Sequence, residues 1–236
     1  MASRTVRSTF TVLTEGLYWF LILGLMLVLA CSPTILIWTL LAPEPENVLL
    51  MLVAALPVVP AVAAASSAWR ARTEDSDPVP AARFLRGYRL TWADSVVVGL
   101  PTLLVLGVLA TNVAYGASLG TEGLSLFFLV LAAAVLLALM RAVTILSEFR
   151  FRRVDLFRLT VLTLLTRPLS TLALLSVLVL ATGVVLLIGG SVLLPAAPLL
   201  SFVLWRTERP TAQWIRERFV SAPPESPTLP VTPGAS

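Results

Sequence analysis

Arg141 is the clearest residue that could do chemistry inside an otherwise apolar stretch of this sequence. It lies in a long uncharged run that ends before Glu148. A charged side chain within a membrane span is costly, so an arginine there marks a candidate functional site. Arg141 is also within about two turns of the predicted span end, from which its long side chain can reach the headgroups. The sequence favours this snorkelling interpretation, and it predicts an i, i+4 surface pair between Glu148 and Arg152.

Cys31 is the one cysteine of the chain, and it follows an apolar run with Arg4 and Arg7 ahead of it. Val28-Leu29-Ala30-Cys31 could be a lipoprotein signal that is cleaved before the cysteine. However, the chain stays apolar after Cys31, whereas a cleaved signal is normally followed by polar mature sequence. The sequence favours an uncleaved first span.

Two residue types are absent from the sequence, and their absence excludes several chemistries. Without histidine there is no imidazole base and no histidine metal ligand. Without lysine there is no Walker-A loop, and all 17 basic residues are arginine. We find no carboxylate pair within a span and no nucleophile–base constellation. We therefore expect neither an enzyme nor a cofactor.

Composition points to a membrane protein. Of 236 residues, 58% are hydrophobic and only 13% are charged, with a mean hydropathy of +0.93. A soluble domain of this length would be about a quarter charged. The net charge is +4, but the sequence has no long basic face of the kind that binds nucleic acid. We interpret it as a signal of membrane orientation.

A bilayer core about 30 Å thick is crossed by about 20 apolar helical residues. The sequence predicts an all-α polytopic protein with six spans, at residues 16–42, 47–69, 95–116, 123–144, 169–188 and 191–205. The last of these is short and would be ambiguous alone. A topology of six spans with both termini in the cytoplasm places every arginine on the cytoplasmic side. The predicted outer loops then hold the acidic residues Glu44, Glu46 and Glu122 and no arginine. We expect residues 1–220 to form one membrane domain of the bacterial cytoplasmic (inner) membrane.

Amphipathic segments are predicted on the cytoplasmic side, at residues 80–93, 155–166 and 210–220. Such helices rest in the headgroup layer with aromatic residues inward and arginines toward anionic lipid. Candidate contacts with lipid or a partner are Arg83, Phe84, Arg86, Tyr88, Arg89, Trp214 and Arg216. The tail, residues 221–236, has a proline at every third position from 224 to 233 and is expected to be disordered.

Spans two and six share a pattern of paired prolines and are expected to be kinked. Each has the form Leu-Pro-x-x-Pro followed by Trp-Arg, with prolines at Pro57, Pro60, Pro195 and Pro198. The match could reflect duplication or two spans that obey the same interface rules. Kinked helices can expose carbonyls to a substrate path, whereas the alanines after Pro60 favour close helix packing.

From residue 15 to about 206 the chain resembles the YesL-like family of bacterial membrane proteins, a family of unknown function. The resemblance rests on Pro57-Val-Val-Pro-Ala, on Phe84-Leu-Arg-Gly-Tyr-Arg89, on the segment 156–168, and on Leu194-Pro-Ala-Ala-Pro198. An asparagine usual in the family after the aromatic-basic pattern is replaced here by Leu90-Thr-Trp92. The resemblance implies a role linked to carbohydrate uptake and supplies no catalytic residues.

The sequence favours an accessory or structural membrane component whose partners are the bilayer and a carbohydrate transporter subunit, and not nucleic acid. The alternative is a small transporter or channel with a path near spans two and six.

Overall fold

The computed structural model describes residues 2–42, 44–74, 79–118, 122–148, 153–188 and 192–216, and its regular elements there are all helices. The expected all-α class is therefore confirmed for this part of the chain; the predicted tail lies outside it. In chain order the elements are α1 (Ala2–Leu40), the 3₁₀ turn η1 (Pro45–Asn47), α2 (Val48–Ala54), α3 (Val58–Glu74), α4 (Pro80–Ser118), α5 (Glu122–Glu148), α6 (Arg153–Thr166), α7 (Pro168–Ile188) and α8 (Leu193–Ile215).

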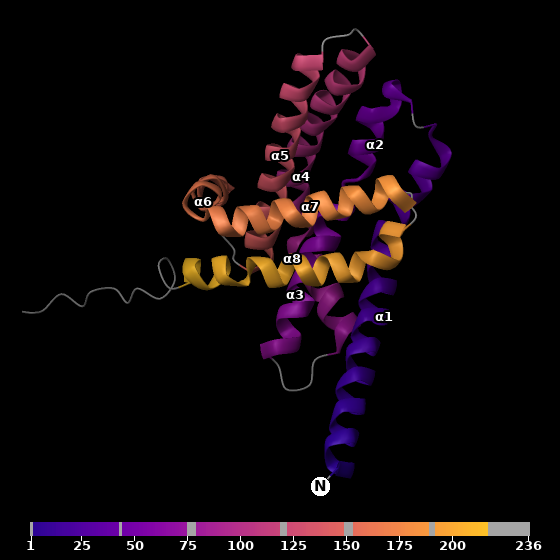
Figure 1. Cartoon of the computed structure of the whole chain (residues 1–236), viewed down its shortest axis with the longest axis vertical. Coiled ribbons are helices and arrows are strands. Elements are labelled where there is room, and N and C mark those ends of the chain that lie inside the picture. Colours follow the sequence, from indigo (N-terminus) through magenta and orange to yellow (C-terminus); the bar gives the residue numbers. More distant parts are fainter. Residues whose placement is uncertain are drawn as a thin grey trace, which may run out of the picture.

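Two sets of helices cross each other (Figure 1). The long helices α1, α4 and α5 run along the long axis of the molecule, and α7 and α8 lie side by side across them. The short helix α6 connects the end of α5 to the start of α7 and packs against both. The hairpin α7–α8 therefore closes one side of the bundle.

In the part of the chain that the structure describes, five helical stretches are long and apolar enough to cross a membrane. They are Leu13–Leu40, Val48–Thr73, Pro80–Gly116, Gly123–Glu148 and Pro168–Leu187. The chain is thus a polytopic α-helical protein by length and composition. The predicted sixth span is not among these stretches, because α8 carries Arg206, Glu208 and Arg209 in the same helix.

Two predicted boundaries within helices are wrong. The amphipathic segment 80–93 and the span 95–116 form the single helix α4, so this segment cannot lie flat in the headgroup layer while α4 crosses the membrane. Likewise, α8 joins the predicted span 191–205 to most of the predicted helix 210–220. Pro210 does not end α8, and the Pro210 carbonyl accepts a hydrogen bond from Arg167 Nη1 at 3.3 Å. Tertiary contacts thus hold α8 together where the local signal predicted a break.

The second candidate span is interrupted. Residues 55–57 form a turn between α2 and α3. Proline lacks a backbone N–H and disfavours helical geometry at the preceding residue, so Pro57 explains the break. The helix resumes with a hydrogen bond from Ala61 N to the Pro57 carbonyl at 3.3 Å.

The tightest packing surrounds α3. Its alanines, Ala61, Ala63, Ala64, Ala65 and Ala68, are fully buried. With no side chain beyond Cβ, these residues let α1, α4 and α8 approach closely. Trp69 belongs to the same core cluster as these alanines, together with Trp19 and Leu23 of α1, Phe84 of α4 and Trp205 of α8. The small residues of the second span therefore serve helix packing.

Gly87 marks the crossing of α4 over α3, and we expect Gly87→Leu to destabilise the protein by about 1–3 kcal/mol, as overpacking does. A Cβ at this position would overlap Ser67 Oγ and lie 3.3 Å from Ala64 Cα. The serine hydroxyl can rotate away, but the α3 backbone must move. Thermal unfolding in detergent measures the loss.

The matched control is Gly183→Leu in α7, where an added Cβ meets no heavy atom within 4 Å. Leucine has the higher helix propensity, so this variant should be as stable as the wild type or more so. Equal destabilisation of both variants would contradict the assigned crossing.

Candidate functional site

The end of α5 that holds Arg141 is covered by protein. Residues 141–147 are all buried, and Arg141 itself is 0% exposed. The snorkelling interpretation is therefore wrong. The reason is the α6–α7–α8 arrangement, which packs over this end of α5 and which local sequence does not reveal. Arg141 instead becomes the centre of an internal polar cluster.

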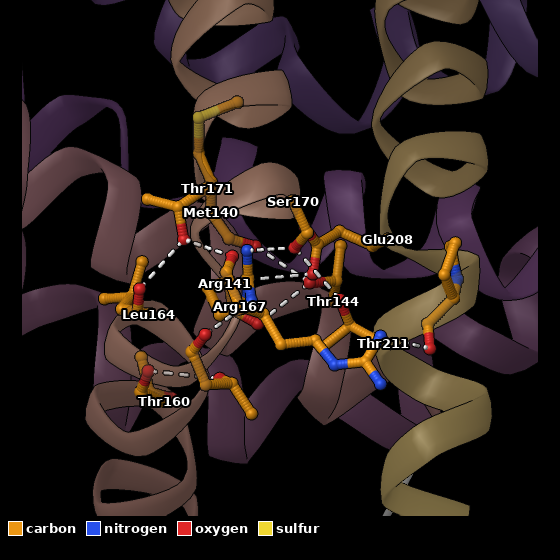
Figure 2. Close-up of polar contacts among 12 residues, drawn as sticks. Met140, Arg141, Thr144, Thr160, Leu164, Arg167, Ser170, Thr171, Glu208 and Thr211 are labelled. Atoms are coloured by element: carbon orange, nitrogen blue, oxygen red, sulfur yellow. Dashed lines mark hydrogen bonds and ion pairs between the residues drawn. The ribbon is translucent and has the colours of Figure 1, made fainter.

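The partner of Arg141 is Glu208 of α8 (Figure 2). Arg141 Nε lies 2.9 Å from Glu208 Oε2, and both side chains are buried. Arg141 Nη2 donates to Ser170 Oγ at 2.6 Å, and Nη1 makes a longer contact of 3.4 Å with the Thr163 carbonyl. Ser170 is in turn 3.0 Å from Thr211 Oγ1. One arginine thus connects α5 to α6, α7 and α8.

The contact between the two charges is short but poorly aligned. Among the described residues, Arg141 Nε and Glu208 Oε1 have no hydrogen-bond partner of acceptable geometry. The 2.9 Å separation therefore reports attraction between charges rather than an aligned hydrogen bond. A buried pair with unused hydrogen-bonding capacity is costly to form, so it is not placed here for stability alone.

Glu208 lies beyond the predicted span 191–205 and titrates in an unusual range. Burial raises its pKa to about 7, against the opposing effects of the Arg141 charge and a hydrogen bond with Ser170. The negative charge of Glu148 contributes further to the increase. A raised pKa means that the folded protein holds this proton more tightly than the unfolded chain does.

Glu208 was missed by sequence reasoning. It stands between Arg206 and Arg209, so it looks like one member of a solvated charged segment. The feature of the sequence that could have indicated its role is the three-residue spacing between Glu208 and Thr211. Positions i and i+3 share a face of a helix, and Arg206 is exposed on another.

Arg167, between α6 and α7, fixes the nearby end of α8. Besides its bond to the Pro210 carbonyl, its guanidinium lies 5.1 Å from the ring centroid of Trp214. Arg216 contacts Glu148 at 3.4 Å, whereas the predicted partner of Glu148, Arg152, lies outside the described residues. Trp214 and Arg216, which were expected to face lipid or a partner, thus make contacts within the protein.

The aromatic-basic segment of α4 divides between the core and the surface. Phe84 is only 2% exposed, so its predicted contact with lipid or a partner is wrong. It belongs to the α1–α3 core, and its ring stacks on that of half-buried Tyr88 with centroids 6.1 Å apart. Arg89 is exposed.

A polar pocket of about 330 Å³ lies between α3, α4 and α5. Three arginines line it among the described residues: Arg70 from α3 and Arg83 and Arg86 from α4. Asp94 and Glu148 lie on its wall as well. Gly87 lines the pocket too, so the close α3–α4 crossing brings these arginines together.

The four prolines of the paired pattern occupy different environments. Pro57 is in the turn between α2 and α3, and Pro60 is fully buried in α3. Pro195 is exposed in α8, whereas Pro198 is buried and packs near Gly24 of α1. Their placement is consistent with packing between helices.

A second, apolar cavity has a volume of about 650 Å³. Its wall draws on α1 to α5, α7 and α8, with Leu27, Leu106, Leu136 and Leu178 among its residues. None of the described residues that line it is charged.

The fold and the two sites define the class as an α-helical polytopic membrane protein with a buried ion pair near one end of the bundle. The model of a family described as "Protein of unknown function, DUF624" matches residues 11–113, which cover α1 to most of α4. No curated protein and no solved structure shows significant similarity to the chain.

Proposed function

We propose that this protein is an accessory component of the bacterial cytoplasmic membrane that docks a partner through its arginine pocket. The observation that carries the proposal is the charge of one pocket wall, where Arg70, Arg83 and Arg86 outnumber Asp94 and Glu148 among the described residues. The positive-inside rule assigns arginine-rich ends of spans to the cytoplasm. A partner with carboxylate or phosphate groups matches guanidinium chemistry, which binds both bidentately. The YesL-like resemblance supports a subunit of a carbohydrate-uptake system as that partner.

The buried ion pair supports this role indirectly. Arg141 and Glu208 are enclosed by four helices, which suits a tie between helices better than contact with a substrate. By holding α8 against α5, the pair also positions Arg216 beside Glu148 on the wall of the pocket.

In vivo cross-linking followed by affinity capture of the full chain tests the proposal. We expect a sugar-transporter subunit to be captured with the wild type and lost with the double variant Arg83→Ala/Arg86→Ala. Arg89→Ala is the matched control, because Arg89 is an exposed arginine of the same helix that does not line the pocket. Capture that is unchanged in the double variant, or lost equally in the control, would contradict the proposal.

A second candidate function is a small transporter or channel, favoured by the 650 Å³ cavity lined by α1 to α5, α7 and α8. Its test is solute flux in proteoliposomes, and flux abolished by Ala133→Phe, which changes the cavity wall, in a folded protein would support it. The apolar lining makes a sugar an unsuitable cargo, which is why we place this candidate second.

We further propose that residues 191–205 form a sixth crossing, with both termini in the cytoplasm. Because α7 and α8 lie across α1, α4 and α5 in Figure 1, this topology requires the α7–α8 hairpin to take a different orientation in the bilayer. Reporter fusions after Ala42 and Gly120 should then report the outer side, and a fusion after Glu225 should report the cytoplasm. An outer-side signal at Glu225 would instead support five spans.

A further inference from the structure

We infer that the apolar cavity is a binding site for one acyl chain of a membrane phospholipid. The cavity lies among residues of all five candidate spans, including Leu27, Val59, Leu106, Leu136 and Leu178. It is therefore inside the part of the protein whose surrounding solvent is lipid chains. Its volume of about 650 Å³ falls within the range of about 300–1,000 Å³ that ligand sites show.

The few polar groups on the cavity wall indicate that its occupant has few hydrogen-bonding groups. Trp38 Nε1 already donates to the Met51 carbonyl at 2.8 Å. Ser201 Oγ accepts a bond from Trp69 Nε1 at 3.1 Å and donates to the Pro198 carbonyl at 2.8 Å. The remaining side-chain polar groups of the described lining are the Cys31 thiol and the Thr182 hydroxyl. A ligand rich in hydrogen-bonding groups would find few partners, whereas an alkyl chain needs none.

An empty cavity of this size is also unfavourable, because wall atoms without neighbours lose their dispersion contacts. Water gains little there, since an ordered water requires two to four polar partners. The bilayer supplies flexible alkyl chains at high concentration directly beside the protein.

The cavity reaches the surface of the helix bundle. Two of its lining residues, Trp38 and Leu129, are 44% and 54% exposed. Other lining residues, such as Leu139 and Val177, are only 7% and 8% exposed. An acyl chain that enters between α1 and α5 would therefore pass from exposed residues to buried ones. Contact of the acyl chain with the buried residues distinguishes entry into the cavity from ordinary contact with the bilayer.

The test is photo-cross-linking of the full chain in vesicles that contain a phosphatidylcholine with a diazirine on one acyl chain. We expect adducts on the buried residues Leu139 and Val177 as well as on Leu180, which is 67% exposed and does not line the cavity. Ala133→Phe, which places an aromatic ring in the cavity, should reduce the adducts on Leu139 and Val177 and leave those on Leu180.

Ala134→Phe is the matched control, because Ala134 is the neighbouring residue of α5, is exposed and does not line the cavity. Its adducts should equal those of the wild type. Ala110→Phe places a ring in the cavity from α4 and provides a second variant if Ala133→Phe does not fold, as judged by thermal unfolding. Adducts confined to exposed residues in the wild type, or adducts on Leu139 and Val177 that are not reduced in a folded Ala133→Phe or Ala110→Phe variant, would overturn the inference.

Discussion

Replacing Glu208 by leucine is expected to destabilise the protein by about 3–5 kcal/mol at pH 8, where Glu208 is mostly ionised, the cost of leaving one member of a buried ion pair without the other. The variant leaves the Arg141 guanidinium, 0% exposed, without its counter-charge. Arginine cannot escape this cost by losing its proton. Unfolding in detergent, followed by loss of helical circular dichroism, measures the change.

The reciprocal variant, Arg141→Met, is expected to cost less, because the remaining Glu208 carboxyl can take up a proton. The raised pKa of Glu208, about 7, shows that its environment already favours the protonated form. The proton on Glu208 adds to the free energy of unfolding at low pH, and this added stability is lost as the pH rises through about 7. Arg141→Met should therefore be less destabilising at pH 5 than at pH 8, whereas Glu208→Leu removes this titration altogether.

The double variant Arg141→Met/Glu208→Leu completes the cycle. It leaves no buried charge in the pair, so we expect its stability to exceed that of either single variant. Arg89→Ala, which removes an exposed arginine, should change stability by less than about 0.5 kcal/mol. Single variants that each behave like Arg89→Ala would show that the two side chains are not paired.

Trp69→Ala is expected to cost about 3 kcal/mol, the lower end of the range for truncating a buried tryptophan. The side chain is 1% exposed, and its ring centroid lies 5.0 Å from those of Phe20 and Phe202. The loss is one of packing contacts rather than of transfer from water, because lipid is as apolar as the protein interior. Thermal unfolding in detergent is again the measurement.

Two further variants separate the contributions of Trp69. Trp69→Phe keeps much of the packing but loses the hydrogen bond to Ser201. The lost hydrogen bond should contribute about 1 kcal/mol to the destabilisation of this variant, in addition to the loss of packing. Trp92→Ala is the matched control, since Trp92 is 42% exposed in α4. A control as unstable as Trp69→Ala would show that the effect is not specific to the α3 core.

The positions of the helices followed from local sequence, but their continuity did not. Apolar length identified the five described stretches that are long enough to span a membrane, and Pro57 lies in the turn that separates α2 from α3. The unbroken course of α4 and α8 depends on contacts with distant segments. At Pro210, the local penalty is opposed by contacts from Arg167 and by the buried pair two residues earlier.

The candidate site was predictable only in part. Arg141 was identified because a charge in an apolar run is conspicuous, yet its environment depends on a helical hairpin formed by residues that follow it. Phe84 shows the same limit for an apolar residue. Its amphipathic spacing was read correctly, but the apolar face packs on α3 instead of lipid.

The position of Cys31 has a practical consequence for spectroscopy. It is the one cysteine of the chain and it lies on the wall of the apolar cavity, next to Leu27 and Val28. The unaltered protein therefore carries a unique attachment point for a thiol-reactive spin label or fluorophore at that wall. The mobility and the solvent polarity sensed by such a label would report the contents of the cavity without any engineered residue.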